Sequence, residues 1–151
     1  MKIDDAFQLI INQIQNESLK RLITQQYKED KWGATISELG QFINAKSLNK
    51  YDHAVAQTFL ARDLSLTYRY QECFEIIQNY KTLSSNLLNS DSDKALKGFM
   101  YHQFSISLGN MGRKKTELYN LFYNKCLRIY DELDLEENKV DYLIQNIDLD
   151  L

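Results

Sequence analysis

Apolar residues recur along almost the whole chain at steps of three and four residues, which is the spacing of amphipathic α-helices. Polar or glycine-containing breaks separate these periodic segments. The pattern predicts about eight helices, near residues 3–14, 19–27, 35–47, 49–68, 73–87, 93–108, 118–133 and 136–147. Helices joined by turns of a few residues lie antiparallel to their neighbours. We therefore expect an all-α fold class, with a single helical-repeat domain over residues 1–151.

Capping and turn residues mark where several of these helices begin and end. Thr35 and Glu38 have the spacing of a capping box, which predicts that the Thr35 side chain caps a helix. Asp93 ends a polar turn and is expected to cap the following helix. The segment 109–112 holds two glycines and is expected to end that helix. Gly40 lies within a helical period, and we expect it where two helices pack closely.

One helix pair, residues 54–85, fits the tetratricopeptide repeat of about 34 residues. The repeat positions that match are Leu60, Ala61, Leu64, Tyr70 and Cys73. Tyr68 stands where the turn glycine is usual and Ser85 where a proline is usual, so the repeat is degenerate. A second pair spans residues 94–133. The expected architecture is therefore a short tetratricopeptide-like solenoid of stacked antiparallel helix hairpins.

Composition narrows the classes of partner. The chain has no proline, so nothing obstructs long helices. Its 18 basic and 21 acidic residues give a formal net charge of −3, which argues against a direct nucleic-acid partner or an anionic membrane surface. No apolar run approaches the roughly 20 residues of a transmembrane helix, and the N-terminal stretch does not resemble a signal peptide. We expect a cytoplasmic protein whose two cysteines are reduced.

Residues suited to metal binding or catalysis are few. The only soft metal ligands are Cys73, Cys126, His53 and His102, and no two of them have a metal-binding spacing. No nucleophile elbow, glycine-rich phosphate loop or zinc-protease motif occurs. We therefore expect no catalytic site, no metal site and no cofactor, and we predict that the protein is not an enzyme.

A helix-turn-helix is a second interpretation of the segment 35–55, with Gly40 at the turn. Only Lys46 and Lys50 would supply positive charge near that turn. A DNA-binding helix normally carries a basic face. We therefore favour the interpretation that this segment belongs to the helical repeat.

The segment from Tyr27 to Gly33, with Glu38, Leu39, Phe42 and Asn44 after it, resembles a stretch of the C-terminal regulatory domain of Rgg/GadR/MutR-type transcriptional regulators. Similar positions near the other end are Lys97, Gly98, Phe99, Gly109, Leu118, Leu133 and the run Cys126 to Tyr130. Those regulators are cytoplasmic receptors for peptide pheromones in quorum sensing. The resemblance implies a cytoplasmic tetratricopeptide-like module that binds a short peptide on its concave face and often forms a homodimer. Those regulators begin with a helix-turn-helix domain, and we expect this chain to lack that domain.

The first hypothesis for function is a non-catalytic regulatory module that recognises a peptide or a partner protein. In stacked helix pairs the first helix of each pair lines the binding surface. The residues expected to face it are Val55, Thr58, Arg62, Ser65, Phe99, His102, Ile106 and Asn110. Arg62 and Asn110 would bond to the peptide backbone or its carboxylate, although a surface charge and a turn former are the alternative interpretations. The alternative function is a small helical adaptor, immunity protein or chaperone that acts by protein-protein binding.

Overall fold

The computed structural model describes residues 3–45 and 47–133, and every regular element among them is a helix. The helices are α1 (Ile3–Gln13), α2 (Glu17–Lys28), α3 (Ile36–Asn44), α4 (Lys50–Leu66), α5 (Tyr70–Gln78), α6 (Tyr80–Ser85), α7 (Asp91–Asn110) and α8 (Glu117–Glu132). The expected all-α class is therefore confirmed for the described part of the chain. The helix expected near residues 136–147 lies outside the described residues.

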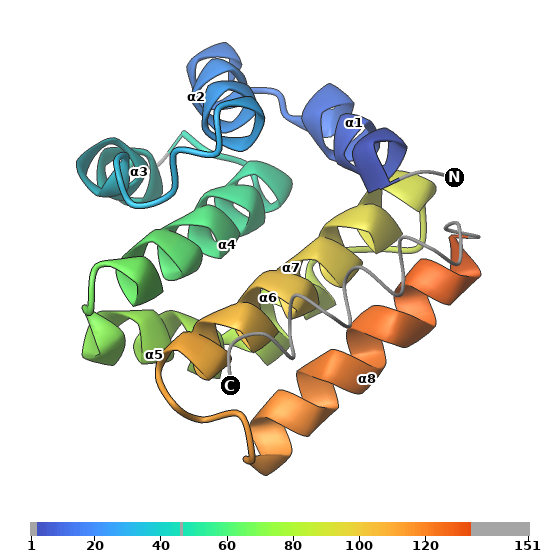
Figure 1. Cartoon of the computed structure of the whole chain (residues 1–151). Helices are drawn as coiled ribbons and strands as arrows, with labels where there is room; N and C mark the ends of the chain where they lie inside the picture. The colour runs from blue at the N-terminus through green and yellow to red at the C-terminus, as the bar shows by residue number, and fades with distance from the viewer. Residues whose placement is uncertain (1–2, 46, 134–151) are drawn as a thin grey trace.

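Two long helices, α4 and α7, form the centre of the molecule. Helix α7 packs against α1, α4 and α8, and α4 packs against α3, α5 and α7. Figure 1 shows α4 and α7 side by side, with α1, α2 and α3 along one border and α8 along the other. A helix with neighbours on several sides has no single apolar stripe. This explains why nearly all of α7 from Ala95 to Gly109 is buried, including its serines and its histidine.

The two expected helix pairs are present as antiparallel hairpins, α4 with α5 and α7 with α8. Within the first hairpin the thiol of Cys73 donates to the carbonyl oxygen of Ala61 at 3.1 Å, and both residues are fully buried. Within the second, Gly98 lets α7 approach α8 closely, since a Cβ added at Gly98 would lie 2.9 Å from the Tyr130 ring. The contacts agree with stacked hairpins, while the solenoid itself stays a prediction.

One helix expected over residues 73–87 is two helices in the structure, α5 and α6. They meet at Asn79, whose φ of −88° and ψ of 14° depart from regular α-helix. The Asn79 N–H bonds to the Ile76 carbonyl, three residues back, in place of the carbonyl four residues back. Asparagine has a lower helix propensity than most residues, which makes a break at this position less costly.

Of the two expected helix caps, Thr35 takes the N-cap position before α3, whereas Asp93 does not cap its helix. The Thr35 side chain makes no cap hydrogen bond, because its hydroxyl donates to Gln26 and to Asp63. Helix α7 begins two residues before Asp93, and the cap is Ser90, whose hydroxyl accepts the Asp93 N–H at 3.1 Å. The serine is the better cap since it precedes the first helical residue and its oxygen reaches the third.

The turn positions agree better with the sequence than the caps do. Helix α7 ends at Asn110, and Gly112 has a φ of +74°, as expected for the glycine-rich segment. Tyr68, where the repeat usually has glycine, has a φ of +63° and is 81% exposed. The expectation for Gly40 was wrong, because a Cβ added there would meet nothing within 4 Å. Gly40 therefore faces open space on α3 and does not mark a close helix contact.

Within residues 3–45 and 47–133, every helix is too short or too polar to traverse a lipid bilayer.

Candidate functional site

The eight residues that the sequence assigns to a binding surface lie on the two central helices, four on α4 and four on α7. Several hydrogen bonds connect this pair of helices, among them one from the Tyr51 hydroxyl of α4 to the Ser92 carbonyl of α7 at 3.1 Å. The Arg62 guanidinium donates from Nη1 to Oε1 of Gln103 at 2.8 Å, and the Asn110 amide donates to the Ser65 hydroxyl at 3.2 Å. The structure therefore brings Ser65 and Asn110 together. It also shows that the side chains of Arg62 and Asn110 help to join α4 to α7.

Most of the eight residues are covered by the protein itself. Val55 and Thr58 have no exposed surface, and the Thr58 hydroxyl donates to the Ala54 carbonyl of its own helix. The side chains exposed by 2 to 6% are Ser65, Phe99, His102 and Ile106, whereas Arg62 and Asn110 are half-buried. Only these last two therefore offer appreciable surface to a ligand in this conformation. Peptide binding by the eight residues stays a prediction.

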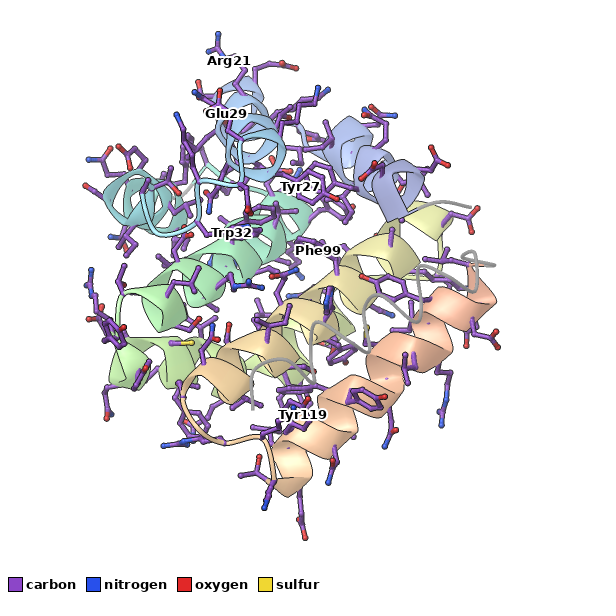
Figure 2. The ribbon with its side chains drawn as sticks, viewed as in Figure 1. Arg21, Tyr27, Glu29, Trp32, Phe99 and Tyr119 are labelled. Carbon is purple, nitrogen blue, oxygen red and sulfur yellow. The ribbon has the colours of Figure 1, made fainter. Side chains whose placement is uncertain are left out.

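An aromatic cluster covers the apolar part of the α4–α7 face. The Phe99 ring centroid lies 5.4 Å from that of Phe59, 6.0 Å from Phe7 of α1 and 6.5 Å from Tyr27 of α2. Trp32 stacks on Phe59 at 4.9 Å. Figure 2 shows Tyr27, Trp32 and Phe99 gathered between α2, α4 and α7. The chain's own α1 and α2 therefore occupy the place where an apolar ligand side chain would meet Phe99.

His102 is the buried titratable group of this face. Burial, followed by the nearby positive charge of Arg62, lowers its pKa to about 3, and neither ring nitrogen has a hydrogen-bond partner. The imidazole is therefore uncharged at neutral pH. The Arg62 guanidinium lies 5.2 Å from the Trp32 ring centroid, in the geometry of a cation–π contact. Arg62 thus contributes to the packing of the face as well as to its charge.

A buried carboxylate on α4, Asp63, organises the segment between α2 and α3. Its Oδ1 accepts the Gly33 N–H and the Gln26 amide, each at 2.6 Å, and its Oδ2 accepts the Thr35 hydroxyl at 3.1 Å. Burial raises the Asp63 pKa to about 6, although these hydrogen bonds and Arg62 oppose the rise. No spacing motif in the sequence indicates this cluster. The only hint in the sequence is that Asp63 stands among the apolar residues of a central helix.

A second buried carboxylate, Asp52, has a similar role at the other end of α4. It accepts the backbone N–H groups of Gln15 and Asn16 at 2.9 to 3.2 Å. Those two residues connect α1 to α2. Both carboxylates therefore bond to backbone donors and fix connections to α4, which is a structural use of an acid and not an acid–base pair.

An open groove lies on the opposite side of α4, between α3 and α5. It consists of two cavities of about 520 and 500 Å³ that share Leu60, Leu64 and Glu72. We call their combined lining the α3–α5 groove, and its remaining residues are Ile36, Ser37, Gly40, Gln41, Asn44, Gln57, Arg69, Glu75, Ile76, Gln78 and Asn79. Its floor is apolar and its walls carry amides. At the rim Arg69 donates two hydrogen bonds to the Glu72 carboxylate, at 2.9 and 2.7 Å.

The two cysteines are buried and unbonded to each other, and burial raises the pKa of the Cys73 thiol to about 12 and that of Cys126 further. Neither is a nucleophile near neutral pH. Across the described ranges 3–45 and 47–133, no three histidine, cysteine or carboxylate side chains are placed to share a metal ion. No family model, curated protein or solved structure matches the chain.

Proposed function

We propose that this chain is a non-catalytic, cytoplasmic binding module that recognises an extended peptide segment, free or displayed by a partner protein. A regulatory role of the Rgg type, in quorum sensing and transcription, is the form of this proposal that the sequence resemblance supports. The observation that carries the binding role is the α3–α5 groove, because it joins an apolar floor to a polar rim along one helix. Peptide grooves commonly combine these two surfaces.

The groove has the chemistry that an extended backbone needs. Leu60 and Ile76 are half-buried in its floor and offer contact to apolar side chains. The wall residues Gln41, Gln57 and Asn79 each carry an amide that both donates and accepts hydrogen bonds. An extended peptide has one donor and one acceptor at each residue, so amides on both walls suit its backbone.

Selection of a random peptide library against the full chain, followed by calorimetric titration of the selected peptides, tests the proposal. Gly40→Trp is the blocking variant, because Gly40 lines the groove and a side chain there projects into open space. Asn124→Trp, on the exposed surface of α8, is the matched control. Gly40→Trp should abolish binding and Asn124→Trp should leave it unchanged.

The same titration tests the α4–α7 face. If the face expected from the sequence is the binding surface, Arg62→Ala should lower peptide affinity by about 1 to 3 kcal/mol, the range for a hydrogen bond to a charged group. Loss in Arg62→Ala with normal binding by Gly40→Trp would move the site to that face. A library that yields no specific peptide would contradict the binding role itself.

A further inference from the structure

A cluster of basic side chains surrounds a cavity of about 330 Å³ that lies between α6 and the hairpin formed by α7 and α8. Lys94 and Lys97 come from the first half of α7, and Lys125 and Arg128 from the second half of α8. Each pair has the three-residue spacing that places side chains on one helix face. Because α7 and α8 are antiparallel neighbours, the two pairs meet at one place, which we call the basic cavity.

Within the described part of the chain, the positive charges of the basic cavity are poorly neutralised. Among the described residues that line it, the carboxylate is Glu132, which lies 3.9 Å from the Lys94 ammonium, at the outer limit of an ion pair. The Lys97 ammonium donates to the Leu88 carbonyl at 3.1 Å, and that of Lys125 lies 5.4 Å from the Tyr101 ring centroid. These contacts hold the two ammonium groups without cancelling their charge.

Among the described lining residues, four cations against one carboxylate leave a formal charge of about +3, in a chain whose net charge is −3. Like charges at close range repel, and a multiply charged anion removes that cost. Lysine binds phosphate as a point charge, whereas the arginine fork bonds two of its oxygens at once. The hydroxyls of Ser84 and Ser85 line the same cavity and supply neutral donors.

We infer that the basic cavity binds a small, multiply charged anion of the phosphate class, such as pyrophosphate or a phosphate monoester. Its volume lies near the lower end of small-molecule sites, which span about 300 to 1,000 Å³. The site is separate from the α3–α5 groove, since it lies on α6, α7 and α8 and shares no residue with it. Anion binding at the basic cavity can therefore be tested independently of peptide binding at the α3–α5 groove.

Titration calorimetry with inorganic pyrophosphate, at fixed pH and ionic strength, tests this inference. The variant is Lys125→Gln with Arg128→Gln, whose side chains are half-exposed and exposed. The control, Lys20→Gln with Arg21→Gln on α2, removes the same charge elsewhere, and Figure 2 shows Arg21 pointing away from the protein. The cavity variant should bind at least about tenfold more weakly, since it loses two charge-assisted hydrogen bonds, while the control should match the wild type.

Phosphorus NMR of pyrophosphate with the wild-type protein gives a second measurement that depends on no variant. The pyrophosphate signal should broaden in the presence of the protein. Added sulfate should reverse the broadening and chloride at equal ionic strength should not, and this result would support the site. Absence of both heat and broadening, or equal loss in the two variants, would overturn it. A pentaglutamate peptide that binds more tightly than pyrophosphate would overturn the phosphate class, because the cavity would then be a receptor for acidic peptides.

Discussion

Two glycines in helices should respond in opposite directions to the same substitution. A methyl group at Gly98 would lie 2.9 Å from Cε1 of Tyr130 and 3.0 Å from Cγ2 of Ile129, well inside the usual carbon–carbon separation of about 3.5 to 4.0 Å. Tyr130 is 1% exposed, so its ring has no free space to enter. Gly98→Ala must therefore push α8 away from α7.

The net effect follows from two opposing quantities. Overpacking of a core costs about 1 to 3 kcal/mol, and alanine in place of glycine within a helix returns about 1 kcal/mol. We expect Gly98→Ala to lower the free energy of unfolding by about 1 kcal/mol. Gly40→Ala has the same gain in helix propensity and no contact within 4 Å, so it should raise the free energy of unfolding by about 0.5 to 1 kcal/mol.

Urea denaturation followed by circular dichroism measures both variants against the wild type on one scale. The two unfolding free energies should differ by about 1.5 kcal/mol or more. If Gly98→Ala stabilised the protein as much as Gly40→Ala does, the close approach of α7 to α8 at this position would be refuted.

Three further substitutions probe the turn, the buried carboxylate and the docking of α1. Tyr68→Gly should stabilise by about 1 kcal/mol in thermal unfolding, because it relieves a positive φ, while Tyr68→Ala, which keeps Cβ, should not. The raised Asp63 pKa means that the folded state binds this proton more tightly than the unfolded state, so its ionisation costs stability. As the pH falls from 7 through about 6 to 4, the free energy of unfolding of the wild type should therefore rise by up to about 3 kcal/mol relative to that of Asp63→Asn. If urea denaturation showed the same difference between the two proteins at every pH, this expectation would be contradicted. Phe7→Ala should cost about 3 kcal/mol, since Phe7 is 6% exposed and stacks on Tyr27 at 3.7 Å, and a loss below about 1 kcal/mol would show that α1 is not packed as described.

Most of the helices could be predicted because their signal is local. Apolar spacing of three and four residues is present in the chain before any tertiary contact forms, and it located the helices now labelled α1 to α4, α7 and α8. The repeat pattern also located the turn at Tyr68, where the structure shows a positive φ. The break at Asn79 could not be predicted, because the apolar spacing continues from α5 into α6.

The candidate sites depended on contacts between distant segments. Thr35 has the local spacing of a helix cap, but Asp63, 28 residues further along, takes its hydroxyl. Phe99 has the position of a groove residue in the repeat, but Phe7 of α1 packs against it. In both cases the contacting residue, Asp63 or Phe7, lies on a different helix far away in the sequence. Residue spacing within one helix therefore could not predict either contact.

The amino-acid sequence alone determined the all-α class, the order of most helices and the pairing into hairpins, because helix periodicity and short connections are properties of neighbouring residues. Only the tertiary structure decided which helix faces are covered and which stay open. Within residues 3–45 and 47–133, it buried the expected face of α4 and α7 under α1 and α2, and it left the α3–α5 groove and the basic cavity uncovered. The reason is that a helix face is buried by whichever neighbour packs against it, and that neighbour is set by long-range packing of the whole chain.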